Sequence, residues 1–125
     1  MQSLNFIDLF CGCGGFSYGL EMAGHNCLMG VDFNQDAVET FKRNHKSAVG
    51  LHMDISKLNK STLSKYLDIK KIDMVVGGPP CQGFSTVGKG DAGDERNSLF
   101  KQFVRVVKLT EPKIIMFENV TGMLA

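Results

Sequence analysis

Cys81 occupies an unusual setting for a structural cysteine. It follows two prolines at the end of an apolar segment and opens a polar, glycine-rich stretch over residues 78–97. The restricted backbone of Pro79 and Pro80 would hold the thiol in one place on its approach. A free thiol titrates near ~8.5, so local activation is needed before it can attack as a thiolate. The pattern predicts a nucleophilic cysteine.

Glu118 is the second candidate for chemistry, because it follows the apolar run Ile-Ile-Met-Phe directly. We expect this carboxyl group to be partly desolvated at the end of a strand. Desolvation raises the pKa of a carboxyl group and favours a protonated form that can donate a hydrogen bond. The alternative is an ordinary solvated glutamate, and the presence of Cys81 at a neighbouring strand end favours the first interpretation.

A glycine cluster after the first apolar segment predicts a cofactor site. Gly12 and Gly14 would let a ligand approach the backbone, and the helix expected next would present its N-terminus. The dinucleotide fingerprint is imperfect, because Ser17 stands where the third glycine belongs. Asp32 follows Gly12 by twenty residues, where an acid can accept both hydroxyls of a ribose. These residues predict a cofactor that carries adenosine, with Asp54 as a further contact to the adenine amine; the alternative is a loop that only turns the chain.

These residues fall at the ends of apolar segments that alternate with amphipathic ones. The pattern predicts strands over residues 5–10, 26–32, 48–53, 71–77 and 114–118. It predicts helices over residues 16–23, 35–44, 58–67 and 99–109, with Gly24 ending the first and Ser98 capping the last. Alternating strands and helices indicate an α/β fold with a parallel sheet and helices on both faces. Ligands bind such sheets at the carboxyl ends of the strands, where the candidate residues lie.

The composition limits the class of protein. The chain has 125 residues, enough for one domain, with 43% hydrophobic residues and a formal net charge of +1. It lacks an apolar run long enough for a membrane span and a secretion signal at its N-terminus, so we expect a cytoplasmic protein with four reduced cysteines. Cys11 and Cys13 are spaced too closely for a usual zinc site, and we expect no metal.

The three motifs, in this order, resemble the DNA (cytosine-5-)-methyltransferase family over nearly the whole chain. The stretch Asp-Leu-Phe-Cys-Gly-Cys-Gly-Gly-Phe resembles the family's cofactor motif, Pro-Pro-Cys-Gln its nucleophile motif and Glu-Asn-Val its third motif. The resemblance implies a Rossmann-like methyltransferase fold. It also implies transfer of a methyl group from S-adenosylmethionine to carbon 5 of a cytosine flipped out of duplex DNA, through a covalent adduct with Cys81. Restriction-modification is the setting it suggests.

The resemblance also assigns roles to individual residues. Cys81 would be the nucleophile, and protonated Glu118 would hold ring nitrogen 3 and the exocyclic amine of the cytosine. The residues expected to contact the cofactor are Phe10, Gly12, Gly14, Asp32, Phe33, Asp54, Ile55 and Leu99, with Phe33 against the adenine ring. The residues expected to contact the substrate are Pro80 and Asn119 in the cytosine pocket, and Ser85, Lys89 and Arg96 on phosphates.

The chain departs from the family by what it does not contain. The family carries a Gln-x-Arg-x-Arg motif, a target-recognition domain and a C-terminal segment that completes the cofactor pocket, and none of these occurs within residues 1–125. We therefore interpret the chain as the N-terminal part of the catalytic domain, inactive until a further segment or a complementary subunit completes it. Two alternatives remain: a tRNA cytosine-5 methyltransferase, and a non-catalytic nucleotide-binding subunit.

Overall fold

The computed structural model describes residues 2–78 and 98–118. Five parallel strands form one sheet in the order β3-β2-β1-β4-β5. The strands are β1 (Asn5–Leu9), β2 (Asn26–Asp32), β3 (Val49–His52), β4 (Met74–Gly77) and β5 (Ile114–Phe117). The chain moves outward from β1 in one direction to β3 and then returns to β4 on the other side, so the strand order reverses between β1 and β4. Ligands bind α/β sheets at such a switch point.

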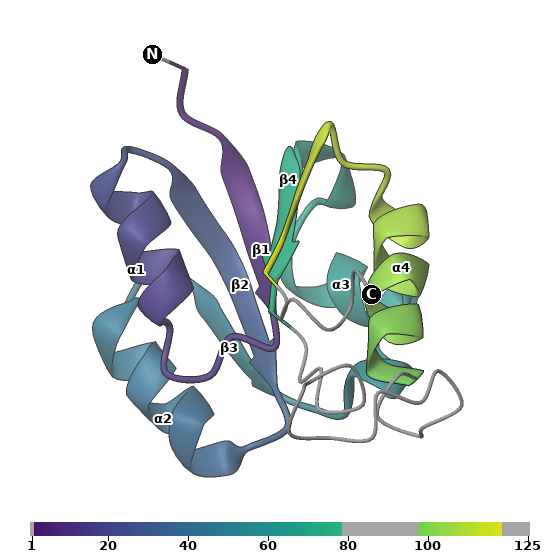
Figure 1. The fold of residues 1–125 in the computed structure, drawn as a ribbon, viewed down its shortest axis with the longest axis horizontal. Coiled ribbons are helices and arrows are strands. Elements are labelled where there is room, and N and C mark those ends of the chain that lie inside the picture. Colours follow the sequence, from purple (N-terminus) through teal and green to yellow (C-terminus); the bar gives the residue numbers. More distant parts are fainter. Residues whose placement is uncertain (1, 79–97, 119–125) are drawn as a thin grey trace, which may run out of the picture.

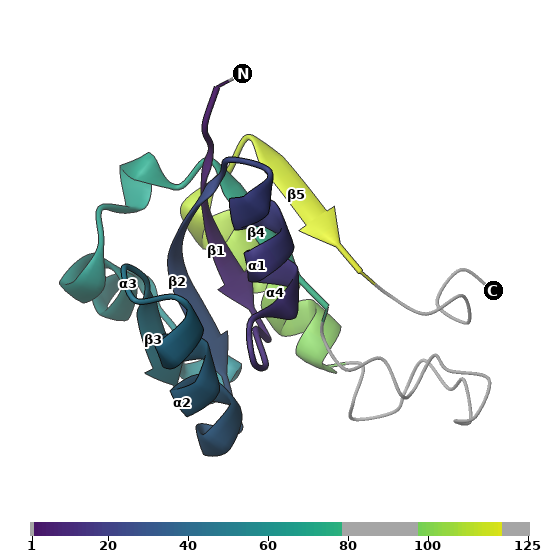
Figure 2. The same cartoon turned by 90° about the vertical axis from the view of Figure 1, so that its left-hand side faces the viewer.

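Helices cover both faces of the sheet, as Figure 1 shows. Helices α1 (Gly15–Met22) and α2 (Gln35–Asn44) lie on one face, which is turned toward the viewer in Figure 2. Helices α3 (Lys60–Tyr66) and α4 (Ser98–Thr110) lie on the other, together with the short 3₁₀ turns η1 (Ile55–Lys57) and η2 (Ile69–Lys71). The expected α/β architecture is confirmed.

Each face of the sheet has its own apolar core, since a parallel sheet covered on both sides buries successive side chains alternately up and down. Ile7, Leu9 and Val75 pack with α4 through Phe103 and Val106. The opposite cluster contains Phe6, Phe41, Met74 and Val76.

Local signals explain where the helices begin and end. Gly24 has φ +97°, and the amide of His25 donates to the carbonyl of Leu20, so α1 ends in the left-handed turn that its sequence predicts. Asn34 accepts from the amide of Ala37 and begins α2. The helix expected over residues 58–67 is shorter, because Asn59 accepts from the amide of Thr62 and starts α3 only at Lys60.

The strand expected over residues 71–77 is also shorter. Asp68 accepts a hydrogen bond from the amide of Lys70, which turns residues 69–71 into η2, and β4 begins only at Met74. The predicted strand is therefore confirmed for residues 74–77, whereas Lys71 belongs to a 3₁₀ turn. Strand β2 and helix α2 have the predicted bounds.

Candidate cofactor and active site

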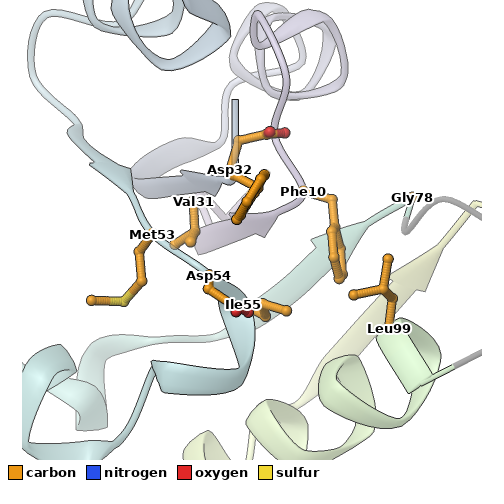
Figure 3. A pocket seen from close by; sticks show the side chains of 9 residues that line it. Phe10, Val31, Asp32, Met53, Asp54, Ile55, Gly78 and Leu99 are labelled. Carbon is orange, nitrogen blue, oxygen red and sulfur yellow. The ribbon is translucent and has the colours of Figure 1, made fainter. Parts of the chain in front are cut away.

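A pocket of about 430 Å³ opens at the carboxyl ends of the strands (Figure 3). Its walls come from the segments that follow β1, β2, β3 and β4 and from the start of α4. The lining residues are Phe10, Val31, Asp32, Phe33, Met53, Asp54, Ile55, Gly78 and Leu99. Six of the eight residues expected to contact a cofactor are therefore brought together in one place. The volume lies in the usual range for small-molecule sites.

Phe10 turns the chain out of β1 in an uncommon conformation. Its φ is +62°, a region that bulky L-residues rarely adopt, and the amide of the next residue, Cys11, donates to the carbonyl of Val31 over 2.9 Å. Figure 3 shows the aromatic ring directed toward Leu99. Strained residues of this kind cluster at binding sites, and here the strain places an aromatic ring in the pocket.

Asp32 holds the glycine loop in place. Its Oδ2 accepts from the amide of Gly12 at 2.8 Å, and its Oδ1 accepts from the amide of Asn34 at 2.9 Å. Each carboxylate oxygen has a further lone pair available for a hydroxyl group. Asp32 is therefore suited to accept ribose hydroxyls, and it also fixes the loop beside them.

The acid after β3 is ordered by its own turn. Asp54 Oδ1 accepts from both the amide of Ser56, at 3.0 Å, and its hydroxyl, at 2.9 Å. These hydrogen bonds hold the pKa of Asp54 below its usual value, so the group is a carboxylate at neutral pH. The next residue, Ile55, is buried and adds an apolar surface to the same wall.

Three further residues that the sequence predicts as cofactor contacts are Phe33, Gly12 and Gly14. Phe33 is 75% exposed at the rim of the pocket, with its carbonyl accepting from His52 Nε2 at 2.9 Å. Gly12 does not line the pocket, but its amide donates to Asp32, which does. Gly14 lies on the side of the loop away from the pocket, where its carbonyl faces His45 Nε2 at 3.1 Å.

Glu118 lies next to the pocket but is not buried. Its amide donates to the carbonyl of Gly77 at 3.0 Å, and its carboxylate lies over Gly78, where an added Cβ would come within 2.7 Å of Oε2. The side chain is exposed, so the expected partial desolvation is wrong in this structure. The physical reason is that β5 is the outermost strand of the described sheet, with exposed residues before Glu118.

Six predicted site residues lie outside the described part of the chain. They are the nucleophile Cys81 and the substrate contacts Pro80, Ser85, Lys89, Arg96 and Asn119. Gly78, the last described residue before Cys81, lines the pocket, and so does Leu99, near the start of the next described segment.

A buried polar cluster beneath the glycine loop was not assigned by the sequence. Asp8 is 1% exposed and accepts a hydrogen bond from the hydroxyl of Ser17, which is fully buried. Burial raises the pKa of Asp8 to about 6, against the opposing effects of Ser17 and of His45. The signal available in the sequence was Ser17 itself, a polar residue where the fingerprint has glycine.

His45 belongs to the same region and joins three elements. Its ring stacks on Phe41 with centroids 4.5 Å apart, its Nδ1 contacts Glu21 of α1, and its Nε2 faces the Gly14 carbonyl. No sequence pattern predicts this role, because Glu21 and His45 are far apart in the chain.

Burial also suppresses the reactivity of two thiols in the described part of the chain. It raises the pKa of Cys27 to about 12 and raises that of Cys11 further still. Cys11, Cys13 and Cys27 are free thiols. Among residues 2–78 and 98–118, no group of three or more His, Cys, Asp or Glu is arranged to hold a metal ion. None of the helices in these two ranges is long and apolar enough to cross a membrane.

Comparisons with known proteins point to one family. Residues 4–125 match the family model for the C-5 cytosine-specific DNA methylase. The type II methyltransferase M1.HphI of Haemophilus parahaemolyticus is 46% identical over 122 residues, which are 95% of this chain and 33% of that protein. The type II methyltransferase M.DdeI of Desulfomicrobium norvegicum is 43% identical over 122 residues, covering 98% of this chain and 29% of that protein.

A solved structure shows the same fold. The crystal structure of a candidate DNA modification methyltransferase encoded within an Escherichia coli prophage superposes with a TM-score of 0.84 at 38% identity. The match covers 98% of this chain and 34% of that one, so the chain spans about a third of the length of these relatives. With a family match over nearly all of its residues and a pocket at the switch point of the sheet, the chain belongs to the C-5 cytosine-specific DNA methylase family.

Proposed function

We propose that the protein binds S-adenosylmethionine in the pocket beside β1 and β2 and methylates carbon 5 of cytosine in DNA. The observation that carries the proposal is the position of Glu118. Its carboxylate lies over Gly78, which lines the pocket and directly precedes Pro79-Pro80-Cys81 in the sequence. A carboxyl group and a cofactor-sized pocket thus lie beside Gly78, the last described residue before the sequence that carries the candidate nucleophile.

The pocket has the chemistry that an adenosine-containing cofactor needs. Phe10, Ile55 and Leu99 offer apolar surface to a flat base, and Phe33 lies exposed at the rim where an aromatic ring can stack. Asp32 would accept the ribose hydroxyls, and Asp54 would accept from the adenine amine. When bound, S-adenosylmethionine supplies an electrophilic methyl group.

The chain's residues would act on the cytosine in a definite order. The Cys81 thiolate forms a bond to carbon 6, which turns the ring into an enamine with electron density at carbon 5. Glu118 is exposed in this structure, and we propose that the bound cytosine and the completing segment remove it from solvent, so that it takes up a proton, donates to ring nitrogen 3 and stabilises the added charge. After methylation, loss of the proton from carbon 5 expels the thiolate and restores the aromatic ring.

The DNA must deliver the base to this site. Because carbon 6 is out of reach inside a duplex, the cytosine is flipped out of the stack, as the base-modifying enzymes do. Pro80 and Asn119 would shape the cytosine pocket, and Ser85, Lys89 and Arg96 would contact phosphates. The proteins matched at 46% and 43% identity are type II methyltransferases, which favours DNA over tRNA as the substrate and an enzyme over a binding subunit.

A further polypeptide segment would complete the enzyme. The chain spans about a third of its relatives, and β5 has a neighbour in the described sheet only on the β4 side. We propose that the additional sequence, in the same chain or in a complementary subunit, covers this edge and supplies the target recognition.

The proposal is tested with duplex DNA carrying 5-fluorocytosine, because fluorine at carbon 5 blocks the last elimination and traps the cysteine adduct. The chain is joined after Ala125 to the remaining two thirds of M1.HphI and incubated with S-adenosylmethionine. We expect a denaturation-resistant protein–DNA adduct that Cys81→Ala abolishes. An adduct that survives Cys81→Ala overturns the assigned nucleophile. Preferential methylation of tRNA over duplex DNA overturns the assigned substrate.

A further inference from the structure

One charged side chain near the pocket has no part in the function proposed above. Arg105 is half-buried on α4, with its Nη2 donating to the backbone carbonyl of Ile55 at 2.8 Å. Its Nε donates to Gln102 Oε1 at 2.7 Å. The guanidinium thus connects α4 to η1, which are separated by fifty residues of sequence at this contact.

Both elements that Arg105 joins are walls of the pocket. Ile55 belongs to η1, and Leu99 is the second residue of α4; both line the cavity (Figure 3). The first two turns of α4 transmit the position of the guanidinium to Leu99, because a helix is stiff over this length. The hydrogen bond from Arg105 to Ile55 therefore connects two walls of the pocket.

The turn that Arg105 holds is weak by itself. η1 has three residues, and isolated 3₁₀ turns of this length have poor hydrogen-bond geometry. Asp54 accepts from the amide of Ser56 and so caps the N-terminal end of η1. Arg105 donates to the Ile55 carbonyl, which faces α4. A planar guanidinium suits this task, since its donors are fixed relative to each other and Gln102 sets its plane.

We propose that Arg105 is a positioning residue for the cofactor pocket. It holds Ile55 and Leu99 at the separation that S-adenosylmethionine and S-adenosylhomocysteine require, without touching the ligand. This inference rests on the proposed cofactor. The Ile55 carbonyl also accepts from the amide of Leu58 at 3.1 Å, so it keeps a partner when the guanidinium is removed. A loss of cofactor affinity in an Arg105 variant can therefore be distinguished from a loss of stability.

The test compares Arg105→Met with Lys108→Met on the same helix. Methionine keeps much of the apolar stem of arginine, and Lys108 is exposed, so its replacement removes the same charge without a connection to η1. Binding of S-adenosylhomocysteine is measured by calorimetry, well below the unfolding temperature, on the chain joined after Ala125 to the remaining two thirds of M1.HphI. We expect Arg105→Met to weaken binding about five- to tenfold, the size of one ordinary hydrogen bond. Lys108→Met should change it less than about twofold.

Two further readouts separate positioning from simple stabilisation. Amide exchange of Ser56, Lys57 and Leu58 should accelerate in Arg105→Met without ligand and stay unchanged in Lys108→Met. Arg105→Lys should restore part of the affinity, because an ammonium can reach the Ile55 carbonyl but cannot hold the planar arrangement with Gln102. A lower unfolding temperature with unaltered affinity would show a purely structural role and overturn the inference.

Failure of the proposed function gives a different result. If the unaltered joined chain binds no S-adenosylhomocysteine, the proposed cofactor is wrong, and the connection between α4 and η1 is judged by amide exchange alone. If the unaltered chain binds and Arg105→Met binds equally well, the cofactor stands and the role of Arg105 is refuted.

Discussion

Asp8 shows how a buried charge can make the stability of this protein depend on pH. Its pKa is raised to about 6 in the folded protein, mainly by burial, from an ordinary value of 3.8. Between these two values the folded state binds more protons than the unfolded state, so the free energy of unfolding falls as the pH rises. The contribution of Asp8 is fully present below pH 3.8 and is lost as the pH rises through about 6.

We therefore predict that Asp8→Asn flattens the pH dependence of stability between pH 4 and pH 7. Asparagine keeps an acceptor for the Ser17 hydroxyl and has no charge to bury. The effect should be at most about 3 kcal/mol, in favour of the variant at pH 7. Urea unfolding at several pH values measures it, with the exposed Glu39→Gln as the control. A variant that loses stability on going from pH 5 to pH 7 as the parent does would contradict the assignment.

His45 should contribute through hydrogen bonds at both ring nitrogens. Because Nδ1 contacts the Glu21 carboxylate and Nε2 faces the Gly14 carbonyl, both nitrogens face acceptors. We predict that His45→Leu lowers the free energy of unfolding by about 2–3 kcal/mol. The substitution leaves the Glu21 carboxylate and the Gly14 carbonyl without the ring nitrogens that they contact. A double-mutant cycle with Glu21→Gln should give a coupling of about 1 kcal/mol. His52→Gln, at an exposed histidine, is the control, and additive effects of His45→Leu and Glu21→Gln would show that the pair does not interact.

Alanine substitutions at two glycines in different elements should change the stability in opposite directions. A Cβ on Gly77 of β4 would lie 2.4 Å from the backbone oxygen of Leu9 in β1, and neither strand can move without breaking the sheet. A Cβ on Gly19, inside α1, would meet nothing within 4 Å. Gly77→Ala should cost at least about 2 kcal/mol of stability. Gly19→Ala should add about 0.5–1 kcal/mol, since alanine favours the helix.

Thermal unfolding of the two glycine variants in one buffer decides between these directions. Equal effects of the two substitutions would show that the contact between β4 and β1 is looser than the structure indicates.

The elements themselves were largely readable from the sequence, and the exceptions have local causes. Strand β2 and helix α2 were predicted with their bounds because an apolar run and a clear amphipathic face have sharp ends there. The segment before β4 was misassigned, because the turn made by Asp68 depends on one side-chain hydrogen bond that hydrophobic pattern does not record. Most of the pocket followed from strand ends. The exposure of Glu118 and the contacts of His45 and Arg105 depend on residues far away in sequence, so they could not be predicted.

In the described sheet β5 pairs on one side only, and this has a consequence for residues 1–125 in isolation. Ile114, Ile115 and Met116 are 41%, 51% and 38% exposed, on a strand that pairs with one neighbour in the described sheet. An apolar edge with unpaired backbone groups favours association with other edges. We predict concentration-dependent self-association by analytical ultracentrifugation, reduced by Ile115→Lys. Met22→Lys, at an apolar residue that is 75% exposed on α1, is the control and should have little effect. Equal effects of both substitutions would point to general solubility and not to the edge.

We expect residues 1–125 alone to lack methyltransferase activity. Two arginines, Arg96 and Arg105, follow Cys81, and the structure engages Arg105 with Ile55 and Gln102. Residues 82–125 do not contain a Gln-x-Arg-x-Arg motif, and β5 pairs with β4 alone in the described sheet. We predict no transfer of radiolabelled methyl groups to duplex DNA by the chain alone above the level of Cys81→Ser. Transfer should appear when the remaining two thirds of M1.HphI is supplied as a separate polypeptide. Robust turnover by the chain alone would mean that its own residues complete the cytosine pocket, and Arg96 would be the first to replace.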